Sequence, residues 1–165
     1  MWAILKYDKK YLGLLQSELI QKLGSNTKFY LPKFKLQTLK KNKLHDKVFY
    51  LLGDYLLCNS PEFKNQNIFH EINFCKGLKY FLNVNNYSQN EINNFVKKCI
   101  INEDKDGYIT QTFFVLRKNK NFKFLSGPFA NMIFKIIQFN YSKIKILMGK
   151  YETEVNIKKY IFSPA

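Results

Sequence analysis

The spacing of apolar residues changes near residue 102, and this change most restricts how the chain can fold. Before it, three segments repeat their apolar residues every three or four positions, which is the period of an amphipathic helix. After about residue 108 that period disappears, and short apolar runs alternate with turn residues, as in proteins built from short strands. We therefore expect two domains of different architecture.

The first hundred residues contain alternating strand and helix signals. Gly24 and Gly77 follow two of the helical segments, and glycine commonly ends a helix. In chain order the expected elements are a strand, a helix, two strands, a helix, a strand and a helix, at 2–7, 12–23, 29–36, 48–58, 68–75, 78–84 and 88–100. A break is expected at Gly53-Asp54 within 48–58, and a capping box at 88–91 starts the last helix. The order β-α-β-β-α-β-α is the ferredoxin-like pattern with an added helix, and it predicts an antiparallel sheet with helices on one face.

The C-terminal part contains five short strand signals within about 45 residues, and many short strands with turns between them predict a small closed barrel. The segment 102–107 is polar and acidic, which marks a boundary. We expect domains at 1–101 and 119–165 with a linker at 102–118, in an α+β protein. The strands of the barrel are expected at 122–124, 133–139, 144–148, 154–157 and 160–161.

The chain is strongly basic, with 27 Lys and Arg against 12 Asp and Glu, giving a formal charge of +15. Such a charge favours polyanionic partners, nucleic acid above all. Nearly all the basic residues are lysines, and Arg117 is the one arginine. AT-rich coding also favours lysine, so genomic composition is an alternative source of part of this charge.

Several classes of protein are excluded by the sequence. Cys58, Cys75 and Cys99 are widely spaced, so neither a zinc site nor a disulfide framework is expected. Free thiols suit a reducing cytoplasm, and no apolar run approaches the ~20 residues of a membrane span. No phosphate loop or nucleophile elbow is present, and no carboxylate cluster outside the expected linker. We expect a cytoplasmic monomer that is no enzyme and that uses no cofactor and no metal.

The segment 102–113 imitates a calcium-binding loop, with Asp104, Asp106 and Gly107 at suitable positions. However, Asn102 stands at the first position and Phe113 at the twelfth, where a bidentate Glu is needed. We therefore interpret this segment as a linker between domains.

Five segments resemble the NusG family of transcription elongation factors in order and spacing. They are MWAILKY at 1–7, FYLPKFK at 29–35, LLGDYLLC at 51–58, GLKYF at 77–81 and FKFLSGPFANMIFKI at 122–136. In the third segment Tyr55 matches the family pattern, while Leu52 replaces Phe and Gly53-Asp54 replaces Pro-Gly. The last segment resembles the start of the family's KOW domain. The departures from the family pattern at Leu52 and Gly53-Asp54 suggest a specialised paralogue of bacterial type.

The resemblance implies a ferredoxin-like N-terminal domain followed by a Src-homology-3-like KOW barrel. It also implies an elongation or antitermination factor whose first domain binds the clamp helices of the largest RNA polymerase subunit. The polymerase-binding residues would be Tyr7, Leu52, Tyr55 and Leu57, although a place in the sheet core is an equal alternative for Leu57. The barrel would recruit a termination factor or a ribosomal protein.

Lys40, Lys41 and Lys43 lie in a basic stretch between two expected strands, which should project as a loop. Lysines in such a loop contact phosphates without reading sequence, and a solvated hairpin tip is the alternative. A second function also stays open, an RNA- or ribosome-binding module with a basic KOW barrel.

Gly127, Pro128 and Phe129 are expected to form the first turn of the barrel. Members of the family usually carry glycine where this chain has Asn131 and Phe134. Asn tolerates a left-handed backbone, so Asn131 can replace glycine at little cost. For Phe134 we expect either a different backbone or a ring that fills space.

Overall fold

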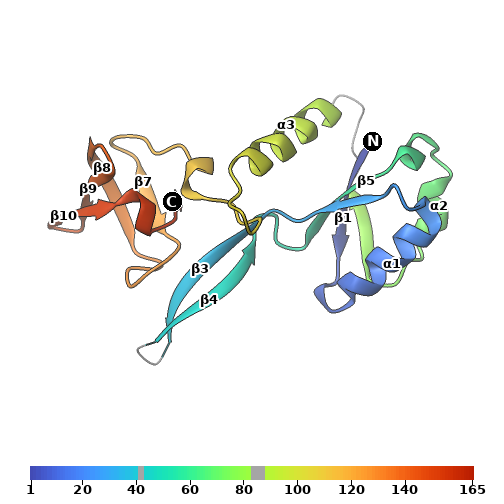
Figure 1. Cartoon of the computed structure of the whole chain (residues 1–165), viewed down its shortest axis with the longest axis horizontal. Helices are drawn as coiled ribbons and strands as arrows, with labels where there is room; N and C mark the ends of the chain where they lie inside the picture. The colour runs from blue at the N-terminus through green and yellow to red at the C-terminus, as the bar shows by residue number, and fades with distance from the viewer. Residues whose placement is uncertain (41–42, 83–87) are drawn as a thin grey trace. The chain divides into compact units, whose positions relative to one another are not determined.

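The computed structural model describes the backbone of residues 1–40, 43–82 and 88–165, and the side chains of all of these except 36–40, 43 and 44. Within these ranges the chain divides into two compact units (Figure 1). The first unit is Met1–Pro32 with Tyr50–Lys98, and the second is Lys33–Phe49 with Cys99–Ala165. The division expected from the sequence, at 1–101, 102–118 and 119–165, stays a prediction.

The first unit is built on a four-stranded antiparallel sheet in the order β2-β5-β1-β6. Its strands are β1 (Trp2–Tyr7), β2 (Lys28–Tyr30), β5 (Tyr55–Asn59) and β6 (Leu78–Leu82). The first strand of the chain therefore lies inside the sheet, between the third and the last strand of this unit. Together with the helices this arrangement confirms the predicted ferredoxin-like domain.

Helices cover both faces of this sheet rather than one (Figure 1). Its α-helices are α1 (Leu12–Leu23), α2 (Ile68–Ile72) and α3 (Ser88–Ile101), and its 3-10 turns are η1 (Lys9–Tyr11) and η2 (Pro61–Lys64). α1 and α2 pack on the face of Leu5, whereas Val96 of α3 packs against Leu57 on the other face. The reason is that β5 is apolar at the consecutive positions 56–58, so both of its faces need cover.

Two strands expected from the sequence are each divided in two. The segment 29–36 divides at Pro32 into β2 and β3 (Lys33–Lys40), and 48–58 divides at Gly53 into β4 (Lys43–Tyr50) and β5. Gly53 has φ +62°, a backbone conformation that glycine adopts without strain, and it lies in the turn at 51–54 that separates β4 from β5. Lys40 and Lys43 of the basic stretch therefore lie on β3 and β4, which form a two-stranded sheet, and Lys41 lies outside the described residues.

The segment that follows α3 packs against the first two residues of β3, Lys33 and Phe34. The amide of Ile109 donates to the carbonyl of Lys33 at 2.8 Å, and the rings of Phe34 and Phe114 stack with centroids 5.5 Å apart. A 3-10 turn, η3 (Gln111–Phe113), follows. The expected linker is thus partly ordered by its own apolar residues.

The remainder of the second unit is a five-stranded antiparallel sheet around one apolar core, in the order β10-β9-β8-β7-β11. Its elements are β7 (Asn121–Phe124), β8 (Ile133–Asn140), β9 (Lys143–Met148), β10 (Tyr151–Asn156), η4 (Ile157–Lys159) and β11 (Phe162–Pro164). Residues from all five strands meet in a single cluster, so the sheet curls around it. This confirms the small five-stranded barrel. None of the helices within the described ranges is long and apolar enough to span a membrane.

The turn between β7 and β8 has the conformation that its residues favour. Gly127 has φ +80° and lies against the Tyr160 ring, whereas Phe129 packs on Phe124 at 5.6 Å. Asn131 takes φ +72°, the left-handed conformation expected of it. Phe134 is buried with 1% of its surface exposed, so its ring fills the barrel core.

Candidate functional site

Two of the four expected polymerase-binding side chains are buried in the first unit. Tyr7 and Leu57 each keep 1% of their surface exposed, Tyr7 under α1 and α2 and Leu57 under α3. Leu52, beside the Leu57 cluster, and Tyr55 are both half-buried. Of these four residues, Tyr55 and Leu52 offer surface to a partner.

Strand pairing places Tyr55 in a row with two residues that the sequence analysis did not single out. Lys6 of β1 lies directly opposite Tyr55 of β5 on one side and Tyr80 of β6 on the other. The three side chains therefore share one face of the sheet. We call Lys6, Tyr55 and Tyr80 the tyrosine–lysine patch.

The members of the tyrosine–lysine patch contact one another directly. The ammonium of Lys6 lies 5.4 Å from the ring centroid of Tyr55 and 5.7 Å from that of Tyr80, within the range of cation–π attraction. The two phenol oxygens are 3.1 Å apart and form a hydrogen bond. Tyr80 is 42% exposed, whereas Lys6 and Tyr55 are half-buried, so this row of the sheet is partly open to solvent.

The next row along the same face is apolar. Ile4 lies opposite Leu57 on β5 and opposite Leu82 on β6. α3 covers Leu57, whereas Leu82 on the outer strand remains 39% exposed. An exposed leucine thus lies two residues from Tyr80 on the same strand and face.

The position of α3 over the other end of β1 is fixed by Trp2. The side-chain amide of Gln89 accepts from the Trp2 backbone amide and donates to its carbonyl, both at 2.8 Å. The indole N–H of Trp2 donates to Asn93 at 2.9 Å. These bonds hold the first turns of α3 above Trp2, at the opposite end of β1 from Lys6.

The electrostatics of the tyrosine–lysine patch follow from its contacts. Interaction with Tyr55, and then with Tyr80, raises the pKa of Lys6, so this lysine stays charged well above neutral pH. The hydrogen bond between the phenols raises the pKa of Tyr55 and lowers that of Tyr80. These opposite directions are those expected if Tyr55 donates and Tyr80 accepts.

A neighbouring carboxylate is already paired. Asp54 lies 3.2 Å from the ammonium of Lys9, and hydrogen bonding to Lys9 lowers the pKa of Asp54. Among the residues described, no carboxylate lies within ion-pair distance of Lys6. Lys6 therefore makes no ion pair within the described residues, although the more distant Asp54 carboxylate also contributes to raising its pKa.

The expected nucleic-acid contacts are only partly described. Lys41 lies outside the described residues, as do the side chains of Lys40 on β3 and Lys43 on β4. Further along β4 the side chain of Lys47 is described, and its ammonium lies 4.9 Å from the ring centroid of Phe49. Both of these residues are exposed, so a cation and an aromatic ring are accessible on this strand.

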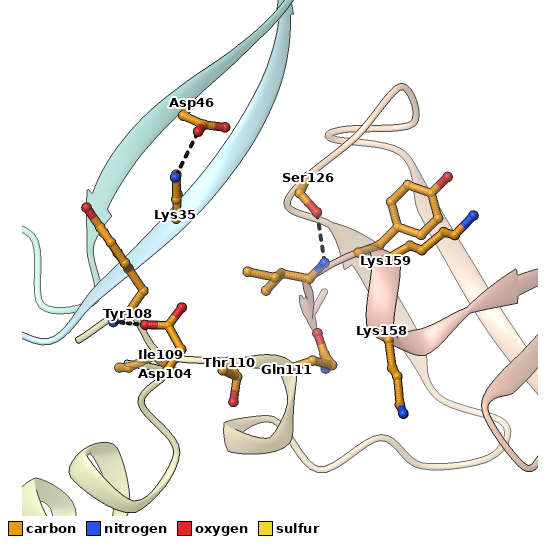
Figure 2. A pocket seen from close by; sticks show the side chains of 12 residues that line it. Lys35, Asp46, Asp104, Tyr108, Ile109, Thr110, Gln111, Ser126, Lys158 and Lys159 are labelled. Carbon is orange, nitrogen blue, oxygen red and sulfur yellow. Dashed lines mark hydrogen bonds and ion pairs between the residues drawn. The ribbon is translucent and has the colours of Figure 1, made fainter. Parts of the chain in front are cut away.

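A hollow of about 330 Å³ in the second unit is lined by polar side chains that are already engaged with one another or with the backbone, or that extend away from the Lys35–Asp46 pair. Lys35 is paired with Asp46 at 2.9 Å, and one oxygen of Asp104 accepts from the backbone amides of residues 106 and 108. Figure 2 shows the side chains of Lys158 and Lys159 extending away from the Lys35–Asp46 pair. Within the described parts of the chain, no group of three His, Cys, Asp or Glu residues could hold a metal ion.

Sequence reasoning reached part of the tyrosine–lysine patch. The motif at 51–58 pointed to Tyr55, and alternation along the first strand places Trp2, Ile4 and Lys6 on one face. The missing information was the register in which the last strand of this unit pairs with the first. That pairing brings Tyr80 beside Lys6, and no pattern within either segment reveals it.

Comparison with known proteins gives structural matches but no match to a family model or to a curated protein. An Spt4:Spt5 complex structure matches at 10% identity and TM-score 0.32, covering 100% of this chain and 98% of that chain. A structure reporting domain interaction in Thermotoga maritima NusG matches at 12% identity and TM-score 0.35, covering 99% and 96%. The strand orders and apolar cores described above define the fold class independently of these two matches.

Proposed function

We propose that this protein is a transcription elongation factor that binds RNA polymerase through its ferredoxin-like unit. The observation that carries the proposal is the partly exposed tyrosine–lysine patch, which contains Tyr55 of the motif resembling the family's polymerase-binding segment. The half-buried Leu52 lies in the same motif. Tyrosines that combine an apolar ring with a polar tip are common anchors of protein interfaces.

The proposed docking partner is the clamp-helix pair of the largest polymerase subunit. An amphipathic helix binds by laying apolar side chains onto such a surface at intervals of three or four residues. The side chains available here are Tyr55, Tyr80, Leu52 and Leu82, whereas Tyr7 and Leu57 support them from within the core. We propose an indirect role for Tyr7 and Leu57 in binding.

The barrel is proposed to recruit a second partner, a termination factor or a ribosomal protein. Its described surface carries exposed apolar side chains, including Ile133 at 59%, Tyr141 at 107% and Tyr151 at 80%. Exposed aromatic and apolar residues of this kind are frequent at interaction sites. Exposed aromatics on a basic chain also suit stacking with RNA bases, which is the second candidate function.

A binding assay tests the polymerase proposal. The full chain is titrated with a fragment containing the clamp helices of the largest polymerase subunit. Tyr55→Ala should weaken binding at least tenfold, because a central tyrosine anchor is lost. Tyr151→Ala, which removes an exposed tyrosine from the barrel, is the matched control and should bind like the unmodified chain. Absence of binding by the unmodified chain would refute the proposal.

The basic stretch is proposed to contact nucleic-acid phosphates. Replacing Lys40, Lys41 and Lys43 with Glu should weaken binding to transcription complexes and reduce the dependence of that binding on salt. Unchanged affinity and salt dependence would show that this stretch is a solvated hairpin tip. RNA binding by the full chain without any clamp-helix binding would favour the RNA- or ribosome-binding function.

A further inference from the structure

We infer that the tyrosine–lysine patch binds a carboxylate of its protein partner, presented on a helix that also carries an apolar residue four positions away. This inference rests on the proposed function, because it specifies the chemistry of the partner at the same surface. It assigns a charge-recognition role to Lys6 and Tyr80 in addition to the aromatic contact by Tyr55.

The first argument is that Lys6 makes no ion pair with any described carboxylate. Its ammonium is held between two phenol rings, at 5.4 and 5.7 Å from their centroids. The nearby carboxylate of Asp54 pairs with Lys9 instead. A lysine held in this way loses little freedom when it pairs with a carboxylate from outside.

The second argument is a count of hydrogen-bond donors. The Tyr55 and Tyr80 oxygens, 3.1 Å apart, share one hydrogen bond, which uses one of their two hydroxyl protons. One phenol O–H therefore remains available beside the Lys6 ammonium. A cation next to a hydroxyl donor suits an anionic acceptor with two oxygens, such as a carboxylate.

The third argument is the spacing along β6 between the tyrosine–lysine patch and the neighbouring apolar row, which contains Leu82. Tyr80 and Leu82 lie two residues apart on β6, which corresponds to about 6.8 Å along an antiparallel strand. Residues four apart on a helix are separated by about 6 Å along its axis. A helix lying along β6 can thus place a Glu or Asp over Lys6 and an apolar side chain over Leu82.

The apolar row favours a protein over a nucleic acid as the occupant. A phosphate could also pair with Lys6, but the exposed part of Leu82 gives no favourable contact to a sugar–phosphate backbone. β6 is the outermost strand of its sheet, and Leu82 on it remains 39% exposed. An amphipathic helix with an acidic residue can pair its carboxylate with Lys6 and place an apolar side chain on Leu82 at the same time.

The test uses two protein probes and one nucleic-acid probe against the full chain. The first probe is the clamp-helix fragment, and the second is a designed helical peptide with Glu and Leu four residues apart. A version of the peptide with Gln in place of Glu isolates the carboxylate. The nucleic-acid probe is a 20-residue single-stranded oligonucleotide.

The expected results follow from the charge of Lys6. The Gln peptide should bind two- to fivefold more weakly than the Glu peptide, the effect of one exposed ion pair. Lys6→Met keeps the apolar stem and should abolish this preference, and Lys6→Glu should weaken binding of both protein probes at least tenfold. Lys79→Glu makes the same change in charge at the adjacent, exposed position of β6 and should have a smaller effect.

Each failure has a separate meaning. Equal binding of the Glu and Gln peptides, or unchanged binding by Lys6→Glu, would overturn the inference even if Tyr55→Ala shows that the clamp helices bind here. Clear preference for the Glu peptide without clamp-helix binding would support the inference and refute the polymerase proposal. Lys6→Glu weakening only oligonucleotide binding would also overturn the inference, in favour of a phosphate site. Circular dichroism of each variant confirms that it is folded.

Discussion

Gly127 provides a quantitative test of the turn that opens the barrel. A Cβ atom at this position would lie 2.4 Å from Cε1 and 2.6 Å from Cδ1 of the Tyr160 ring. The ring itself packs edge-on against Phe124, with centroids 5.7 Å apart. Gly127→Ala therefore forces the ring away from the barrel core in addition to straining a backbone at φ +80°.

The expected loss of stability has two parts. An alanine in the left-handed conformation costs about 1–2 kcal/mol, and displacing a packed side chain costs about 1–3 kcal/mol more. Gly149→Ala is the matched control, because Gly149 has φ +62° and a Cβ atom added there would meet nothing within 4 Å beyond its neighbours in the chain. The difference between the two variants should thus be about 1–3 kcal/mol, the part due to Tyr160 alone.

The assay is urea unfolding followed by far-ultraviolet circular dichroism, with hydrogen exchange of barrel peptides to localise the effect. In a Tyr160→Leu background the cost of Gly127→Ala should fall toward that of Gly149→Ala, because the ring that causes the clash is absent. Equal losses for Gly127→Ala and Gly149→Ala in the unmodified background would refute the reasoning.

Three further predictions concern the two cores and the ordered turn after α3. Phe134→Ala should cost about 3–5 kcal/mol and abolish hydrogen-exchange protection in the barrel, whereas Phe139→Ala, 42% exposed, should change little. Burial raises the pKa of Cys58 from 9.0 to about 12, so iodoacetamide at pH 8 should not label it in the folded chain. Because this thiol ionises at lower pH in the unfolded chain than in the folded chain, the free energy of unfolding should fall as the pH rises from about 9 to 12. The fall should be smaller in Cys58→Ala, which lacks the thiol. Asp104→Ala removes the acceptor of two backbone amides, at 3.0 and 2.9 Å, and should accelerate amide exchange at 106 and 108; unchanged exchange would contradict the role of this carboxylate.

Local patterns predicted the elements more reliably than their limits. The helix at 12–23 begins and ends as expected, because its apolar stripe and Gly24 are both local signals. The helix expected over 68–75 ends at Ile72, although Cys75 still joins the same core through a turn. The division at Pro32 was missed because apolar residues continue across it, whereas the break at Gly53-Asp54 was expected from the sequence and lies between β4 and β5.

The sequence by itself determined the two architectures, the strand order along the chain and the turn at Gly127, because apolar period, glycine and proline act on neighbouring residues. It also pointed to Tyr55. Only the tertiary structure decided which expected interface residues are accessible: Tyr7 and Leu57 are covered by helices from other parts of the chain. The tyrosine–lysine patch likewise depends on β1 pairing with β5 on one side and with β6 on the other, long-range contacts that no local pattern encodes.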